Sequence, residues 1–523
     1  MKLQSSIALN LLIASVCLLG CSEENKKPEA QLGELEFVVT GNAEAQPYFK
    51  NGLLLLHSFE YDDAAENFSK AHETDSTFVM AYWGEAMTYN HALWRYQNKE
   101  KADSILKLLA ATPDLRVSKA KTNIEKDFIN AINILYGDGS KAERDDKYAT
   151  FMSSLYEKYP GHAEVASFYS IALLGSVEVG RDTTVYGQAA TIAKTVLVKN
   201  PNHPGALHYL IHSYDDPDHA HLALEAADAY AKVAPSASHA LHMPSHIYLA
   251  LGMWDKVISS NVAAWAASEE RKQRKGLNND ALGYHSFHWL MYALLQKGRS
   301  EEAKKMVTEM QHYCDSLSSP RAREHVILLK STYLVESNDW HMEISSIEVK
   351  EDDLNIGLRA MNNFVNGMKA FHDNDEKQLA NAISTMHDER MLASDKIIES
   401  SGHSCGSVNA NSPNLLDVQY AEVMEMELQA LSSQLKKDSV STDKWFKQAT
   451  ALENSVSYSF GPPTVVKPSN EMYGEWLLEM KRPSEAFTQF ELALKAAPNR
   501  IQSVNGLAAA SSQMNEKKAL ATK

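Results

Sequence analysis

Four histidines carry the clearest chemical signal in the sequence, and they come as two matching pairs. His208 and His212 are four residues apart, and His242 and His246 repeat this pair 34 residues later. Side chains four residues apart lie on one face of a helix, about 5–6 Å from each other at Cβ. Imidazole is a common ligand of transition metals, whereas Mg and Ca prefer oxygen. The two pairs therefore predict a divalent transition-metal site, with Zn or Cu as the expected ion.

The interval of 34 residues also identifies the elements that must position these pairs. It is the period of the tetratricopeptide repeat (TPR), in which each unit is one helix-turn-helix. Residues 48–76 and 470–499 fit the first and last units most clearly. Small residues are required where two helices approach closely. The small and large packing positions are filled by Gly52, Ala64, Phe68 and Ala71 in the first unit and by Gly474, Ala486, Phe490 and Ala493 in the last.

The chain resembles TPR proteins over nearly its whole length after residue 44. The stretches "HMPSHIYLALGMW" and "SFGPPTVVKPSNEMYGEW" also resemble a group of bacterial TPR proteins. The resemblance implies an all-α fold, a superhelical solenoid of antiparallel helix pairs. It implies no activity. We expect almost no strand between residues 44 and 515.

Numbering each unit by the TPR consensus places seven histidines on the concave side of three successive helices. His208, His242 and His288 fall at position 5 of their units, and His212 and His246 fall at position 9. Position 2, which also faces the groove, is occupied by His239 and His285, and Asp215 and Asp216 follow at positions 12 and 13 of the first of these helices. We expect His239, His285, His288, Asp215 and Asp216 to be additional groove ligands.

Several functions fit this pattern. The leading expectation is a scaffold that binds a peptide or protein partner in its concave groove, where histidines can form hydrogen bonds without metal or can bind Zn or Cu. One alternative is a metal storage or delivery protein. Another is a metal-dependent hydrolase with Asp215 or Asp216 as the base. A fourth is a glycan-binding lipoprotein of the SusD-like type, although most of this chain is accounted for by repeat units.

Composition narrows these possibilities. The chain has 523 residues and a net charge of -16, and it contains no basic patch of the kind that neutralises phosphates, so we expect no nucleic acid partner. No His-Glu-x-x-His, Gly-x-Ser-x-Gly or phosphate-binding glycine loop is present in the sequence. We therefore assign no catalytic residue and do not expect an enzyme.

The N-terminus predicts a membrane address. An apolar run from Ile7 to Leu19 is too short for a membrane span and ends in Leu-Leu-Gly before Cys21, as in a bacterial lipobox. Cys21 is the expected lipidation site, and lipid would anchor the protein in the bacterial cell envelope, in the outer membrane by expectation. The predicted segments are the signal peptide (1–20), a flexible stalk (21–43), N-terminal TPR units with the histidine-lined groove (44–316), degenerate helical repeats (317–455) and a C-terminal TPR unit with a capping helix (456–523).

Three further expectations concern the C-terminal half. Glu471, Glu475 and Glu479 fall at positions 5, 9 and 13 of the last unit, where we expect a solvated helix face. Residues 460–468 are rich in proline and predict an extended loop over one edge of the groove. Cys314 and Cys405 remain after the signal peptide and Cys21 are set aside, and the sequence leaves open whether they pair.

Overall fold

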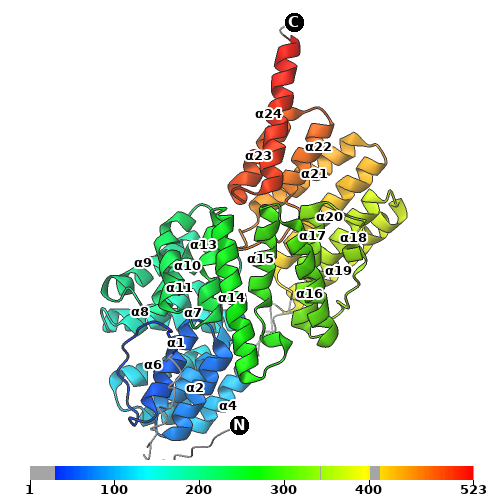
Figure 1. Ribbon diagram of the computed structural model, residues 1–523. Helices are drawn as coiled ribbons and strands as arrows, with labels where there is room; N and C mark the ends of the chain where they lie inside the picture. The colour runs from blue at the N-terminus through cyan, green and yellow to red at the C-terminus, as the bar shows by residue number, and fades with distance from the viewer. Residues whose placement is uncertain (1–29, 342, 401–412, 522–523) are drawn as a thin grey trace, which may run out of the picture.

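The computed structural model describes residues 30–341, 343–400 and 413–521. Over these residues the chain is a succession of helices joined by short turns, and neighbouring helices pack as antiparallel pairs (Figure 1). The described strands are β1 (Asn90–His91) and β2 (Tyr96–Gln97), which form one antiparallel hairpin. The stack runs from α2 and α4 at one end to α24 at the other (Figure 1). The predicted all-α TPR-type solenoid is confirmed.

The helices have the following bounds. The N-terminal set is α1 (Gln46–His57), α2 (Tyr61–Thr74), α3 (Val79–Met87), α4 (Lys99–Leu109), α5 (Pro113–Lys119), α6 (Asn123–Leu135), α7 (Lys141–Lys158), α8 (Ala163–Ser176) and α9 (Thr183–Lys199). The middle set is α10 (Pro204–Ser213), α11 (Leu224–Val233), α12 (Ser238–His242), α13 (Pro244–Ala250), α14 (Trp254–Lys275), α15 (Tyr284–Gln296), α16 (Ser300–Ser316) and α17 (Pro320–Ser337). The C-terminal set is α18 (Ile356–His372), α19 (Glu376–Ser400), α20 (Leu415–Leu435), α21 (Ser439–Ser455), α22 (Ser469–Glu479), α23 (Pro483–Ala496) and α24 (Ile501–Ala521). Short 3-10 turns are η1 (Ala92–Trp94), η2 (Ala220–Ala223), η3 (Asn279–Ala281) and η4 (Glu343–Ser346).

The first and last units pack as the sequence predicts. Phe68 is fully buried, and its ring lies between two glycines. A Cβ added at Gly52 would lie 2.9 Å from this ring, and one at Gly84 would lie 2.3 Å from it. At the other end, a Cβ at Gly506 would lie 2.2 Å from the ring of Phe490. Only glycine allows helices to approach a phenyl ring this closely. The same large-against-small contact therefore holds both ends of the solenoid.

The stalk prediction needs correction for part of its length. The signal peptide, Cys21 and the stalk as far as residue 29 lie outside the described residues. Residues 30–43 pack on the body, with Leu32, Phe37 and Val39 buried and the rings of Phe37 and Phe128 5.2 Å apart. These apolar side chains gain more from burial than the extended segment loses in chain freedom. A flexible stalk is therefore wrong for residues 30–43.

The helix that carries the second histidine pair is interrupted but not bent out of register. Pro244 has no N–H to donate, so α12 ends at His242 and α13 begins at Pro244. Met243, between them, keeps helical angles of φ -53 and ψ -37. The two segments therefore continue on one axis, and His242 and His246 still share a face.

A loop from the C-terminal half returns to the N-terminal units. The backbone N–H of Arg181 donates to Ser457 Oγ at 2.8 Å, and Tyr420 donates to the carbonyl of Ser457 at 2.9 Å. The boundaries predicted at residues 316 and 455 stay a prediction, since one core cluster extends from Leu282 to Ala510 across both. None of the helices described here is both long and apolar enough to cross a bilayer.

Candidate metal centre

The two histidine pairs lie side by side in the interior of the solenoid. His208 and His212 lie on α10, which begins with Pro204 at its first turn, and His242 and His246 lie on α12 and α13. The four side chains are each 4% exposed or less. The structure thus brings together the four residues that the sequence predicts as ligands, but it buries them where an open groove was expected.

Asp215 orients one imidazole from each pair. Its Oδ2 atom accepts from His212 Nδ1 at 3.3 Å and from His246 Nδ1 at 3.1 Å, while Oδ1 is paired with Arg181. Burial opposes ionisation of this carboxyl, but Arg181 and the two imidazole N–H groups lower its pKa below the usual range. Asp215 is therefore a carboxylate that fixes the tautomer of two rings, as partners of metal-bound histidines do.

The position of Asp215 differs from the expectation. Helix α10 ends at Ser213, so Asp215 and Asp216 lie in the turn beyond it and not on the helix. Asp215 turns back onto the imidazoles. Asp216 instead pairs with Arg181 at 3.3 Å and with His219 Nδ1 at 2.8 Å, so it is not directed at the cluster.

Two further rings are held by carbonyl oxygens, which can only accept a hydrogen bond. His208 Nδ1 lies 2.7 Å from the carbonyl oxygen of His57. His242 Nδ1 lies 2.6 Å from Asn261 Oδ1, whose amide nitrogen donates to the carbonyl of Val257 at 2.9 Å and so fixes the orientation of the amide. Both Nδ1 atoms must therefore carry hydrogen, which leaves the lone pair of each neutral ring on Nε2.

In the second histidine pair, the Nε2 lone pairs of the two rings face each other. His242 Nε2 and His246 Nε2 are 3.2 Å apart, and both rings have their hydrogen on Nδ1. Neither nitrogen can donate to the other, and burial lowers the pKa of both rings, that of His246 to about 4. Two nitrogen ligands of a tetrahedral metal, each at 2.0–2.1 Å, lie about 3.3–3.4 Å from each other. The pair thus has the spacing and the charge state of two metal ligands.

The first pair is joined by a ring of the next unit, His239. His208 Nε2 lies 3.2 Å from Nε2 of His239, and the buried His212 Nε2 has no hydrogen-bond partner among the described residues. A buried nitrogen without a partner is costly and calls for an explanation such as an ion. Burial also lowers the pKa of His208 and His239, so both rings are neutral at pH 7.

Six imidazoles therefore form two groups of three. The ligand atoms within each group all lie within 4.8 Å of one another. We call these groups the first trio, His208, His212 and His239, and the second trio, His242, His246 and His285. In each trio the two buried rings come from one repeat unit, and the third, part-exposed ring comes from the next unit.

Phe59 covers the first trio and is held in a strained backbone conformation. Its ring lies 4.2 Å from His208 and 5.6 Å from His239, centre to centre. Its φ of +54° is the left-handed conformation, which the equivalent turns of other units give to Gly252, Gly298 or Asn338. A bulky residue there costs of order 1–3 kcal/mol and persists where the surroundings enforce it. Lys437 and Lys481 adopt the same conformation in the equivalent turns of the C-terminal units, so it is the contact with His208 that places Phe59 at the site.

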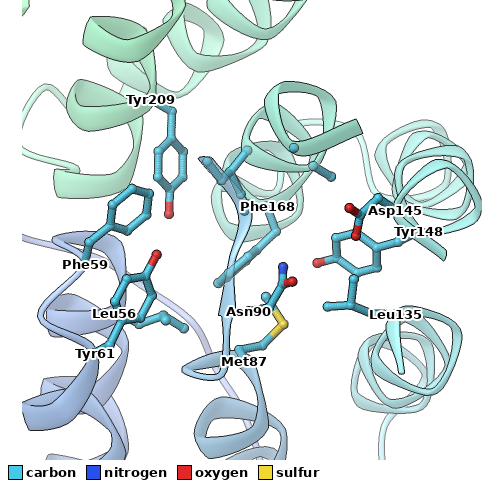
Figure 2. Close-up of a pocket in the computed structure, with 14 residues that line it drawn as sticks. Leu56, Phe59, Tyr61, Met87, Asn90, Leu135, Asp145, Tyr148, Phe168 and Tyr209 are labelled. Carbon is cyan, nitrogen blue, oxygen red and sulfur yellow. The ribbon is translucent and has the colours of Figure 1, made fainter. Parts of the chain in front are cut away.

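Phe59 also lines a small apolar pocket on its other side. Figure 2 shows Phe59 and Tyr61 at one side of this pocket, with the ring of Tyr209 nearby. The pocket has a volume of about 30 Å³ and includes none of the six imidazoles. It has room for about one or two waters.

The second trio is closed by aromatic rings from distant segments. The ring of Trp289 lies 4.5 Å from that of His246, and Phe460 lies 5.1 Å from it on the returning loop. Gly461 makes this closure possible, because a Cβ there would lie 2.6 Å from the Trp289 ring. A loop over the groove edge was predicted for residues 460–468, and Phe460 and Gly461 show that it reaches the histidines.

One predicted ligand lies outside the trios. His288 Nε2 bonds to Thr332 Oγ1 at 2.9 Å, and burial lowers its pKa to about 3. His288 follows His285 by three residues on α15, and the structure directs only His285 to the cluster.

A third group of buried histidines lies beneath the first trio and is fully hydrogen-bonded. Glu164 accepts from Nε2 of His57 at 2.7 Å and of His203 at 3.0 Å. The remaining ring nitrogens accept from the Tyr209 hydroxyl and the Ala206 N–H. All four ring nitrogens are therefore used in hydrogen bonds, so this group supports the site and is not counted as a further metal site.

The returning loop borders a small cavity next to the first trio. The cavity has a volume of about 80 Å³ and is lined by residues that include His212, Asp215, Arg181, Tyr458 and Phe460. No sequence pattern pointed to Arg181 or Tyr458 as neighbours of the histidines. For Phe59 a sign existed, namely an aromatic residue where a helix-to-helix turn favours Gly or Asn.

The last unit contains a different buried polar cluster. Glu471 is fully buried and pairs with Arg500 at 2.8 Å and with Lys467 at 3.1 Å. Arg500 also pairs with Glu336. The expected solvated face is therefore wrong for Glu471, because α24 and the returning loop cover that face and supply the opposite charges.

Fold and site together define the class: a TPR-type helical solenoid with a buried polyhistidine cluster. No protein-family model matches the sequence, and a search of curated proteins gives no match. Solved structures with a similar arrangement include yeast Tom70, at 11% identity over 91% of this chain and 89% of that chain, with a TM-score of 0.33. Others are the APC/C hetero-tetramer Cut9–Hcn1 (11%, 91% and 78%, 0.37) and the human IFIT1 dimer with m7Gppp-AAAA (13%, 84% and 83%, 0.37). At these values the likeness adds nothing to what the helices themselves establish.

Proposed function

We propose that this protein binds a transition metal, zinc or copper, at the two histidine trios. One observation carries the proposal: His242 Nε2 and His246 Nε2 face each other at 3.2 Å while their Nδ1 atoms donate to Asn261 and Asp215. Two buried lone pairs in contact repel unless a cation lies between them. Transition-metal ions satisfy this arrangement, and imidazole suits them.

The arrangement argues against a peptide cradle at these histidines. A side chain that binds a peptide backbone must be reachable, and His208, His212, His242 and His246 are buried. The hydrolase alternative also loses support. Asp215 already accepts from two imidazoles and pairs with Arg181, so it has no lone pair directed at a metal-bound water.

Metal analysis tests the proposal. The full chain is purified without a histidine tag, stripped with chelator and titrated with Zn and Cu, and bound metal is measured by mass spectrometry. We expect tight binding in the wild type and strong loss in His208→Ala/His242→Ala. His219→Ala is the matched control, because its ring pairs with Asp216 outside the trios. Binding of neither ion below about millimolar, or an unchanged double variant, would contradict the proposal.

We also propose that the solenoid is held at the bacterial envelope by lipid on Cys21. The support is the lipobox that ends at Cys21, since a lipid chain on that residue tethers the folded body that follows it. Cys21→Ser should abolish fatty-acid labelling and move the protein to the soluble fraction. A wild-type protein that takes up no fatty-acid label and appears in the soluble fraction would show that the predicted lipid anchor is wrong.

Partner binding is a second candidate, and it belongs to the C-terminal units. A hollow of about 320 Å³ lies there, lined by residues that include Trp340, His372, Trp476 and Glu479. This is at the lower end of the size of binding pockets. Glu479→Arg reverses an exposed charge in the hollow and should weaken selection of ligands from a displayed peptide library. Equal selection by variant and wild type would remove this candidate.

A further inference from the structure

The two trios are copies of one pattern in the repeat. Each takes positions 5 and 9 of one unit and position 2 of the next, so the corresponding residues are His208 and His242, His212 and His246, and His239 and His285. The pattern then stops. The following unit has His288 at position 5 but Tyr292 at position 9, and the Tyr292 hydroxyl accepts from Arg500 at 3.1 Å. The solenoid therefore builds a three-histidine site twice.

We propose that each trio binds one copper ion and that the two ions form a binuclear centre that binds dioxygen in its cuprous state. The inference rests on the proposed metal-binding function and adds the number of ions, their identity and the small ligand. Three imidazoles per ion leave a coordination position open, which is the mark of a reactive site and not a structural one.

The two sites adjoin. His212 of the first trio and His246 of the second donate to the same oxygen of Asp215, and their ring centres are 5.2 Å apart. Because both Nδ1 atoms point at that oxygen, both Nε2 atoms point away from it. His239 and His242 provide a second contact between the trios, with ring centres 6.0 Å apart. The two trios therefore meet at two pairs of neighbouring rings.

Charge favours copper(I). The six imidazoles are neutral ligands, and the carboxylate behind them, Asp215, is already paired with Arg181. Two divalent ions would bring four positive charges into this interior, whereas two cuprous ions bring two. Uncompensated buried charge is costly. Among the divalent ions copper also binds nitrogen sites most tightly, so the oxidised pair remains bound.

The space beside the centre selects the small ligand. The cavity has a volume of about 80 Å³ and is lined by His212 of the first trio and by Phe460, whose ring also lies 5.1 Å from that of His246 in the second trio. A cavity of about 150 Å³ is what accommodates benzene, so an aromatic or peptide substrate does not fit here, whereas a diatomic molecule does. In the reaction each copper(I) gives one electron to dioxygen. The product is peroxide bound to two copper(II) ions, the O–O bond remains, and no proton is required.

Stoichiometry tests the pairing. The full chain, purified in detergent without a tag, is loaded with copper(I) under anaerobic conditions. We expect two ions per chain in the wild type and in His219→Ala. We expect one ion in His239→Ala or His285→Ala, and none in the variant that carries both of these changes. These two histidines are the part-exposed members of the trios, and His239→Gln and His285→Gln serve if an alanine variant fails to fold. One ion in the wild type overturns the pairing, and none overturns the metal-binding proposal itself.

Dioxygen uptake tests the chemistry. The wild type with two cuprous ions should consume one dioxygen per two coppers and give a copper(II) electron paramagnetic resonance signal far below two spins, because peroxide couples the ions. A variant with one ion should show a full one-spin signal once oxidised chemically. Failure to take up dioxygen, a full two-spin signal, or selection of zinc over copper in direct competition would each overturn the inference.

Discussion

Positions 5 and 9 of the helical repeat carry polar side chains in two regions of the molecule. In the middle units they are His208, His212, His242 and His246, and in the last unit they are Glu471 and Glu475. The glutamates find their partners within the chain: Lys467 reaches both of them and Arg500 reaches Glu471. The histidines are oriented through Nδ1, but the Nε2 atoms of His242 and His246 are left facing each other, and Nε2 of His212 has no partner among the described residues.

The contrast shows how two buried polar clusters in one fold can differ in purpose. A cluster whose charges and hydrogen bonds close on themselves acts as structure. A cluster that is oriented on one side and unsatisfied on the other is prepared for something from outside.

Removing a charge from the cluster of Glu471, Arg500 and Lys467 should lower the stability of the fold whether or not metal is present. Glu471→Gln leaves Arg500 fully buried with one carboxylate fewer, and removal of one partner from a buried ion pair costs about 3–5 kcal/mol. Urea unfolding followed by circular dichroism measures this. Glu475→Gln is the control, because its side chain is 43% exposed and should cost far less.

The same variant has a pH signature. Burial alone would raise the pKa of Glu471, but Arg500 and Lys467 lower it to about 2, against 4.5 in the unfolded chain. A lowered folded-state pKa contributes stability above about pH 4.5 that is lost as pH falls toward 2. The stability gap between wild type and Glu471→Gln should therefore narrow below pH 4.5. A gap that stays constant to pH 3 would contradict this assignment.

Metal binding at the two histidine trios should raise the stability of the folded state. A metal at one hundred times its dissociation constant stabilises the folded state by about 2.7 kcal/mol. We expect this gain in the wild type and in Glu471→Gln, and its absence in His208→Ala/His242→Ala. Thermal unfolding with and without copper or zinc measures it. A gain of equal size in the double histidine variant would place the metal elsewhere.

Weakening the orientation of the rings should have a smaller effect. Asp215→Asn removes the charge that fixes His212 and His246, and loss of such a partner lowers metal affinity by about 10–100-fold. Asp216→Asn, one residue further on, should leave affinity unchanged, because Asp216 is directed at Arg181 and His219. Equal effects of the two changes would show that only the local charge matters.

Removing the ring of Phe59, which covers the first trio, should change the rate of metal release more than the metal affinity. Phe59→Asn keeps a residue that tolerates φ of +54° and deletes the ring over His208. Relief of backbone strain offsets lost packing, so we expect a stability change within about 1 kcal/mol. Metal release to a chelator, followed by stopped flow, should be several-fold faster. An unchanged release rate would show that Phe59 does not restrict access.

The sequence was sufficient for the fold and for the choice of the four buried histidines, because both follow from the repeat. Gly52 and Phe68 had to pack as they do wherever a 34-residue unit forms. Position within the unit also determines which side of a helix His208 and His242 occupy. Those properties are local, and periodicity records them.

Depth of burial and remote partners could not be predicted. Glu471 has the sequence pattern of a solvated helix face, and the approach of Arg500, just before α24, and of Lys467 makes it interior. Asp215 was predicted on a helix, but α10 ends at Ser213 and the turn brings the carboxylate back. Phe460 reaches His246 through a loop whose path depends on every unit between them. Such contacts come from the curvature of the whole solenoid.

The returning loop determines when the histidine site can close. Arg181 and Ser457, which anchor the loop, are 276 residues apart in the chain. Contacts this distant in sequence form late in folding, after the local helix pairs. The histidines of α10 to α13 are therefore positioned early, while the Phe460 side of the site stays open until the last units are folded. Ions have free entry on that side during the interval, and once the loop has docked, the part-exposed rings of His239 and His285 mark the side from which the folded site is still reached.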